Sequence, residues 1–503
     1  MKMMHRLAAM LLVIIMFASI NTAQAADDGY AQSYTYNYDY WSDIRESPDA
    51  YRVADVIYVG ELGLDTAMRR PQSLYIRNND IYVCDTGNNR ILQIRKEDQG
   101  YSLVRVIDAV QGCEPATFNT PNDVFVDVDN NLYIADTNNE RIIMVDENLN
   151  FLKQFTKPTD ETFDQSMKFL PYKLVADVSG RVFTLVTNVN KGIAKFESNT
   201  HFTGFVGANK AKYNLADYIW KTYFSTKEQR EKQESFVPTE YANLYIDEES
   251  FIYATNIVFS EYDLLWDVAQ PIRRLNGIGN DILIKNDRYP PIGDLYWVEG
   301  NEQYGPSKLV DITVLDNDIY VAVDRTRGRI FGYDSQGIML WAFGTSGNNE
   351  GAFNSAISID HMGKDLYVLD QNEGNITVFT TTEYGQLIYD ASAAYLKGDY
   401  DGSAEYWEKV VEQNANYNLA FIGIGRSLMR QDKFEEAMEY FEMAHDRENY
   451  GRAFRLWRKI WVEENVVWMV IVLAVLLIVP IVRKQIKKRK MEVEMYERNQ
   501  VAK

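Results

Sequence analysis

An aspartate recurs at the end of four similar segments, each followed by a turn rich in Thr, Asn and Gly. The positions are Asp85, Asp136, Asp324 and Asp370. Carboxylates in this pattern could bind a hard cation such as calcium, or they could accept hydrogen bonds from backbone N–H groups of the turn. The turn residues favour the second role, and Arg90, Arg141 and Arg329 are spaced to pair with such carboxylates between repeats. We therefore interpret these aspartates as structural.

Other residues that could do chemistry are few. The chain has four histidines, of which His5 lies in an export signal and His445 in a later helical region. Only His201 and His361 remain near the aspartates, too few for a three-histidine zinc centre. We find no Gly-Lys-Ser/Thr phosphate loop and no G-x-S-x-G motif. The sequence predicts no catalytic residue, no metal-binding residue and no cofactor, with calcium as the alternative because it needs only oxygen ligands.

The aspartates belong to a repeated hairpin, seen in IYVCDTGNNRI ending at Ile91, LYIADTNNERI ending at Ile142 and LYVLDQNEGNI ending at Ile376. Apolar residues alternate before each turn, as expected of strands. The positions that open the units are Pro71, Pro121, Pro171, Pro238, Pro306 and Ala356. Six units of short strands at a period of about 50 residues predict a mainly β fold, a six-bladed β-propeller.

This pattern resembles the NHL repeat, which is found in extracellular and enzymatic six-bladed propellers, and the resemblance covers residues 51–383. It implies that the central aromatic residue of each hairpin packs between blades. These residues are Tyr82, Tyr133, Phe183, Tyr253, Tyr320 and Tyr367. Some propellers of this class are zinc-dependent lyases or calcium-dependent lactonases, so the resemblance also leaves an enzyme open.

Units three and four each carry an insertion of about seventeen residues. We expect a helix from Ala208 to Ser235 and a loop from Gly277 to Gly305. The candidate ligand-binding residues are Trp220, Tyr223, Tyr296 and Trp297. Aromatic side chains on loops at a propeller mouth suit stacking on a glycan or gripping a protein partner. The alternative is that they only dock on the rim.

The N-terminal region contains a basic start, an apolar run and Ala23-Gln24-Ala25, which predict a cleaved signal peptide at residues 1–25. In the aromatic-rich segment 26–50, Tyr30, Tyr34, Tyr36, Tyr38 and Tyr40 alternate, and we expect a strand that adds to a blade edge or covers the channel. The strand from Tyr51 to Val59 is expected to join the last blade and close the ring.

After the propeller the apolar period changes to about 3.6, and two segments align at an offset of 34 residues in region 384–462. This spacing is typical of tetratricopeptide (TPR) repeats, and a plain helical stalk is the alternative. The uncharged run from Val466 to Val482 predicts a transmembrane helix at 463–482. The tail 483–503 has eight basic and three acidic residues, which favours a cytoplasmic C-terminus and an extracytoplasmic propeller.

The whole chain has a net charge of −20 although its tail is basic, so the propeller region is strongly acidic. Such a surface repels phosphate backbones, and we expect no nucleic-acid partner. Cys84 and Cys113 are the only cysteines. In an exported chain they could form a disulfide, but Cys84 occupies a strand position that also suits a free buried thiol.

Together these features predict a single-pass cell-membrane protein whose propeller captures a glycan or a protein partner. The TPR-like helices would dock a second protein. The architecture looks like that of Gram-positive surface propeller proteins, which implies a role beside envelope or solute-uptake components. The alternative is a calcium-dependent hydrolase or lyase of the lactonase type.

Overall fold

The computed structural model describes residues 34–207, 241–266, 269–285, 290–295 and 305–501. The chain divides into two compact units. One comprises Met1–Tyr38 and Ser42–Gln386, and the other comprises Asp39–Trp41 and Leu387–Lys503. The expected signal peptide at 1–25 lies outside the described residues, as does the expected helix at 208–235.

The first unit is a six-bladed β-propeller, which confirms the predicted fold class. Blade one has β4 (Ser73–Arg77), β5 (Asp80–Asp85), β6 (Arg90–Lys96) and β7 (Tyr101–Ile107). Blade two has β8 (Pro121–Val126), β9 (Leu132–Asp136), β10 (Arg141–Val145) and β11 (Phe151–Thr156). Short 3-10 turns, η1 (Thr86–Asn88) and η2 (Thr137–Asn139), follow the aspartates in these two blades.

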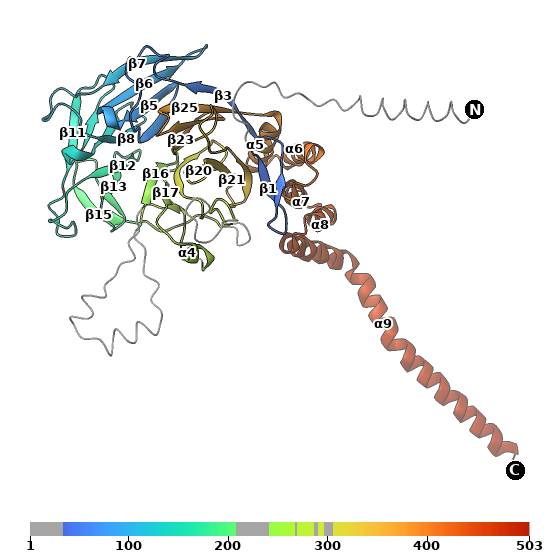
Figure 1. Ribbon diagram of the computed structural model, residues 1–503. Helices are drawn as coiled ribbons and strands as arrows, with labels where there is room; N and C mark the ends of the chain where they lie inside the picture. The colour runs from blue at the N-terminus through green and yellow to red at the C-terminus, as the bar shows by residue number, and fades with distance from the viewer. Residues whose placement is uncertain (1–33, 208–240, 267–268, 286–289, 296–304, 502–503) are drawn as a thin grey trace, which may run out of the picture. The chain divides into compact units, whose positions relative to one another are not determined.

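The remaining blades repeat this antiparallel order (Figure 1). Blade three has β12 (Pro171–Ala176), β13 (Val182–Val186), β14 (Ile193–Phe196) and β15 (Phe202–Val206). Blade four has β16 (Tyr241–Ile246), β17 (Ile252–Asn256) and β18 (Ile272–Leu275), with the short helix α4 (Glu261–Leu265) before β18. Blade five has β19 (Leu309–Val314), β20 (Tyr320–Asp324), β21 (Arg329–Tyr333) and β22 (Met339–Phe343), and blade six has β23 (Ala356–Met362), β24 (Asp365–Asp370) and β25 (Asn375–Thr381).

The first strand of each blade lies innermost. These strands contact one another in the cyclic order β4, β8, β12, β16, β19, β23 and back to β4. Strands in the middle of a blade, such as β9 and β10, are buried at every residue because neighbouring blades cover both of their faces. The outer strand β11 alternates between more and less exposed residues, as a strand covered on one face does.

The core consists of apolar layers between adjacent blades rather than one central cluster. The aromatic residue at the centre of each hairpin is buried, as predicted. These residues are Tyr82, Tyr133, Phe183, Tyr253, Tyr320 and Tyr367.

Three N-terminal strands complete the sheets. β3 (Tyr51–Ile57) pairs antiparallel with β25, so the first strand before the repeats closes the ring at blade six, as predicted. β1 (Tyr36–Tyr38) pairs with β22 and with β2 (Ile44–Glu46), extending blade five outward. The part of the aromatic-rich segment at 36–38 therefore adds to a blade edge, one of the two roles expected for it.

The strand register corrects two of the predicted unit openings. Pro121 is paired with Asp136, and the equivalent partners in blades four and five are Tyr241 with Asn256 and Leu309 with Asp324. These units therefore open three residues after Pro238 and Pro306. The prolines misled the alignment because a proline fits the bulged start of an edge strand without being required there.

The second unit is helical. Its elements are α5 (Glu383–Leu396), which begins at the end of the propeller, α6 (Tyr400–Gln413), α7 (Asn418–Arg430), α8 (Phe434–Met443) and α9 (Arg447–Val501). Consecutive helices from α6 to α9 pack on each other. Gly423 and Gly425 on α7 permit this packing, because an added Cβ would lie 2.4 Å from the Trp407 ring and 2.6 Å from the Phe441 ring, respectively.

Helix α9 contains the run from Val466 to Val482, and by length and composition it is the one helix among the described residues that could cross a membrane. The apolar window of this helix is not buried by the rest of the chain. Trp461 and Trp468 are exposed near the start of this run.

Candidate functional site: the polar centre of the propeller

Six polar residues face the centre of the propeller, one from the innermost strand of each blade. In five blades it is the third residue of that strand, and in blade one it is Ser73, the first residue of β4. We call these six residues the inner ring: Ser73, Asp123, Lys173, Asn243, Asp311 and Ser358. All six are buried. In five of the six blades a β-bulge is found beside this position, for example between Leu309 and Asp311. A bulge re-aims the side chain that follows it.

One hydrogen-bond geometry repeats around the ring. Each innermost strand is the edge of its sheet, so its outward N–H groups need partners. The N–H of Leu174 donates to Asp123 Oδ2 of the preceding blade at 2.8 Å, and the N–H of Ile359 donates to Asp311 Oδ2 at 2.8 Å. At the junction of blades six and one, the N–H of Leu74 donates to Ser358 Oγ at 3.1 Å.

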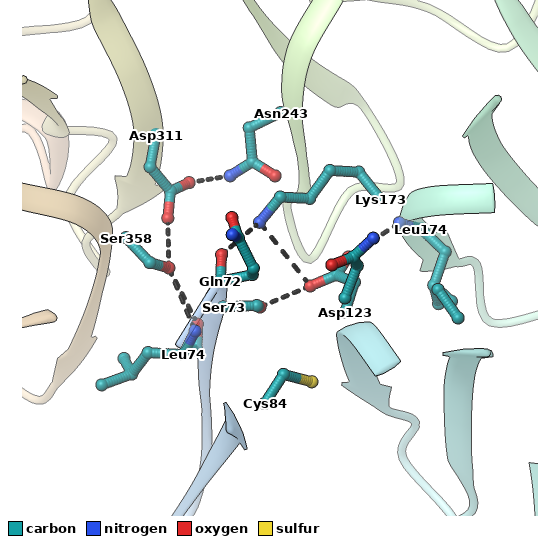
Figure 2. A network of polar contacts seen from close by, with 12 residues as sticks. Gln72, Ser73, Leu74, Cys84, Asp123, Lys173, Leu174, Asn243, Asp311 and Ser358 are labelled. Atoms are coloured by element: carbon teal, nitrogen blue, oxygen red, sulfur yellow. Dashed lines mark hydrogen bonds and ion pairs between the residues drawn. The ribbon is translucent and has the colours of Figure 1, made fainter. Parts of the chain in front are cut away.

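Side chains of the inner ring bond to each other as well (Figure 2). The Ser73 hydroxyl donates to Asp123, the Asn243 amide donates to Asp311, and the Ser358 hydroxyl donates to Asp311 Oδ2 at 2.5 Å. Lys173 Nζ donates to the Gln72 carbonyl at 3.3 Å and lies 3.8 Å from Asp123 Oδ1. Ring residues thus connect five of the six blade junctions.

The two ring carboxylates differ in their electrostatic surroundings. Asp123 has the Lys173 ammonium beside it, although burial still raises the pKa of its carboxyl. Asp311 has no cation within ion-pair distance among the described residues. Burial raises the pKa of the Asp311 carboxyl to about 7, against the more distant charge of Lys173 and the hydrogen bonds from Ser358 and the backbone.

A second layer lies two residues further along the innermost strands. Tyr75 and Tyr245 donate to carbonyl oxygens of the next blade, those of Val126 and Val314, at 3.2 Å and 3.4 Å. Asp360 accepts from the N–H of Ile76 at 2.6 Å. The second layer therefore repeats the blade-to-blade geometry of the inner ring with larger side chains.

A threonine, a histidine and an aspartate meet at this layer, which invites comparison with a catalytic triad. Thr313 Oγ1 lies 2.7 Å from His361 Nδ1 and 2.9 Å from Asp360 Oδ1, and the same His361 nitrogen lies 3.5 Å from Asp360. In a triad the base uses one ring nitrogen for the nucleophile and the other for the carboxylate. The two contacts here share Nδ1 and Thr313 is fully buried, so this group has the geometry of a structural contact.

The space enclosed by the two layers is small. A cavity of about 30 Å³ is lined by residues of all six innermost strands, including Asp123, Asn243 and Asp311. Such a volume holds about two water molecules. This cavity can therefore hold water, and a sugar or a peptide is too large for it.

The structure confirms that the recurrent aspartates are structural. Each accepts the backbone N–H of a residue in the connection before its blade: Asp85 from Arg69, Asp136 from Asn119, Asp324 from Lys308 and Asp370 from Asn354, at 2.7–2.8 Å. Each carboxylate therefore fastens the connection between blades to the hairpin that follows.

The expected pairing of arginines between repeats is wrong. Arg90 and Arg141 bond to Asp85 and Asp136 within the same hairpin, at 2.6 Å and 2.9 Å, because the two residues face each other across the strand pair. Arg329 donates instead to the carbonyl oxygens of Gly344 and Tyr34. In blade five it is Arg327 that lies near Asp324, at 3.5 Å.

The suggested disulfide is absent from the structure, where Cys84 and Cys113 are both free and buried. Cys84 lies on β5 directly opposite Ser73, and burial raises the pKa of its thiol well above the usual value. Cys113 Sγ lies 3.4 Å from the carbonyl oxygen of Val110. The second alternative, a buried free thiol, is the one found.

The four candidate ligand-binding aromatics, Trp220, Tyr223, Tyr296 and Trp297, lie outside the described residues. A different aromatic pair is described beside them in sequence. Tyr262 and Trp266 on and after α4 are 64% and 66% exposed, with ring centroids 5.7 Å apart. A capping box between Ser260 and Asp263 fixes the start of this helix.

Sequence reasoning missed both the inner ring and this aromatic pair. The ring could have been found from the third residue of each unit once the units were correctly aligned, and the pair from the helical spacing of Tyr262 and Trp266. Among the described residues, no three His, Cys, Asp or Glu side chains come together in a way that could hold a metal ion.

Comparisons with known proteins agree with the fold. A family model described as the NHL repeat matches residues 68–94. The chain contains an NHL repeat. This match covers the whole hairpin β4–β5, which carries the inner-ring residue Ser73 and the structural Asp85, and most of β6. No curated protein sequence matches the chain.

Solved structures resemble it at low identity. A catalytically inactive virginiamycin B lyase from Staphylococcus aureus is 11% identical, with 66% of this chain and 100% of that chain covered and a TM-score of 0.41. An auxiliary nutrient binding protein from Bacteroides thetaiotaomicron is 12% identical, with 63% and 70% covered and a TM-score of 0.40. This similarity concerns the fold alone.

Proposed function

We propose that this chain is a membrane-anchored extracytoplasmic binding or scaffold protein. Its propeller captures a glycan or a protein partner through surface aromatics, and its helical repeats, of the TPR type, dock a second protein. The observation that carries this proposal is the combination of a small central cavity with an exposed aromatic pair. The cavity between the inner strands is too small for a glycan or a peptide, which supports recognition at the surface.

The aromatic pair has the properties of a binding element. Tyr262, Leu265 and Trp266 are each more than 60% exposed, and burying one such aromatic ring is worth about 1.5–3 kcal/mol. The capping box keeps this segment helical, so little conformational entropy is lost on binding. Trp220, Tyr223, Tyr296 and Trp297 extend the same proposal to the two insertions.

The anchor is the apolar run of α9. An unburied apolar helix of this length is unfavourable in water and favourable in a bilayer. The basic residues from Arg483 to Lys490 follow it directly, and basic residues mark the cytoplasmic side. The acidic propeller region would then lie outside the membrane, where a glycan or a protein of the envelope is within reach.

The experiment is affinity capture from solubilised membranes with the full chain as bait. Changing Tyr262 and Trp266 to Ala, and separately Trp220 and Trp297 to Ala, should each reduce capture at least tenfold, because a lost aromatic contact costs more than 1.4 kcal/mol. Val178→Ala is the matched control, since Val178 is 74% exposed on blade three. Undiminished capture by both double variants would contradict aromatic-mediated binding.

A further inference from the structure

The inner ring contains more carboxylates than ammonium groups, although neutral polar side chains could also join the blades by hydrogen bonds. Two carboxylates and one ammonium group are buried together, and the ammonium lies beside Asp123 rather than Asp311. Asp311 accepts from Asn243, Ser358 and two backbone N–H groups, those of Ile312 and Ile359. All of these donors are neutral. A buried carboxylate with neutral partners is the group in this centre that gains most from binding a proton.

Among the described residues, no ion pair joins Asp311 to a cation, and Lys173 on β12 acts on it from a greater distance. The other titratable groups on the innermost strands around the cavity are Tyr75 on β4, Asp123 on β8, Tyr245 on β16, and Asp360 on β23 with its neighbour His361. His361 contacts Thr313, two residues further along β19. Burial opposes the ionisation of Asp311, and the charge of Lys173 favours it from a greater distance.

We propose that Asp311 is a proton-binding switch at the centre of the propeller, and that its ionisation loosens the contacts among blades four, five, six and one. Asp311 links blade four through Asn243 and blade six through Ser358. Ser358 in turn accepts from the N–H of Leu74 on blade one at 3.1 Å, while its one hydroxyl hydrogen is donated to Asp311. A charge on Asp311 must be hydrated, and the adjoining cavity gives water a place to enter.

The sign of the effect follows from the pKa of Asp311, about 7 when folded and about 3.8 for an exposed aspartate. Between pH 3.8 and pH 7, Asp311 is protonated while the blade contacts are intact and ionised once they open. The free energy of opening therefore falls as the pH rises towards 7, and it changes little at higher pH. The propeller is expected to be tighter in mildly acidic than in alkaline surroundings.

Cys84 is a natural reporter of this opening. It is fully buried and lies opposite Ser73 on the strand next to β4, which the ring holds in place. The experiment measures the rate of Cys84 modification by N-ethylmaleimide in the full chain in detergent, resolved by peptide mass spectrometry. Rates at pH 6 and pH 8.5 are compared between wild type and Asp311→Asn, so that the intrinsic pH dependence of the thiol cancels.

The ratio of the wild-type rate to the Asp311→Asn rate should rise about tenfold from pH 6 to pH 8.5. Asp80→Asn is the control, because arginine and glutamine partners lower the pKa of Asp80 and keep it ionised at both pH values. The ratio of the wild-type rate to the Asp80→Asn rate should be the same at both pH values. If the ratio of the wild-type rate to the Asp311→Asn rate is also the same at both, the proposal is overturned. The proposal is also overturned if calcium or sodium salt slows labelling of wild type but not of Asp311→Asn at pH 8.5, because Asp311 would then bind a metal ion rather than a proton.

A second variant covers the case in which Asp311→Asn does not fold. Ser358→Ala removes one donor from the Asp311 carboxylate, so the rise in Cys84 labelling should move to higher pH than in wild type. Cys113, which is also a free buried thiol, serves as the reference in the same sample. An unchanged midpoint in Ser358→Ala would reject the switch.

Discussion

At the scale of single residues, the same side chain does different work according to its position in the repeat. Asp136 and Asp311 are both buried aspartates on propeller strands. Asp136 faces Arg141 across one hairpin, so its charge is compensated. Asp311 accepts hydrogen bonds from amide, hydroxyl and backbone N–H groups, all of which are neutral. Asp136 therefore makes a structural contact, whereas the proposed role of Asp311 is to respond to pH.

The fastening can be tested by removing one charge. Asp136→Asn leaves the Arg141 guanidinium buried without a counter-charge, and we expect a loss of about 3–5 kcal/mol in the free energy of unfolding. Urea unfolding of the full chain in detergent measures this loss. Glu140→Gln is the control in the same turn, since Glu140 pairs with the exposed Lys168. Equal stability of the two variants would refute a structural role for the Asp136 pair.

At the scale of elements, the sequence was sufficient to predict those features that need particular residues for their backbone geometry. The hairpin, its turn and the aspartate are visible because they recur with nearly the same letters, and they gave six blades and the closing strand. The inner ring was not visible, because Ser, Asp, Lys and Asn share only their polarity and their place in the strand. Tyr241 and Leu309 stand where proline opens other units. The units were therefore aligned wrongly in blades four and five, and the inner ring could not be seen.

The helical unit was predicted from a different pattern, an apolar period of about 3.6 and two segments that align at an offset of 34 residues. Gly425 on α7 carries the argument, since a Cβ there would lie 2.6 Å from the Phe441 ring. Gly425→Ala should therefore cost about 1–3 kcal/mol through overpacking.

Gly451 on α9 is the matched control, because nothing lies within 4 Å of its added Cβ. Gly451→Ala should raise stability by up to about 1 kcal/mol through helix propensity. Thermal unfolding followed by far-ultraviolet circular dichroism distinguishes the two. Destabilisation by Gly451→Ala, or none by Gly425→Ala, would contradict the packing described here.

At the scale of the whole molecule, the proposal joins a closed propeller to a single membrane helix. We expect protease added to intact cells to remove the propeller and leave a tag at Lys503 protected. Deleting residues 466–503 should release the protein from the membrane fraction, because the deletion removes the apolar run. Digestion of the tag from outside the cell would reverse the proposed orientation.

The closing strand β3 has a consequence for how the chain folds during its synthesis. β3 emerges before any blade, but its partner β25 belongs to the last blade to be made. Until then β3 and the unfinished blade six each present an open hydrogen-bonding edge, and pairing across so long a stretch of chain is slow. The hydrogen-bonding edges of β3 and of blade six therefore stay unpaired while the chain is being made. The propeller can close only after all six repeats are in the same compartment.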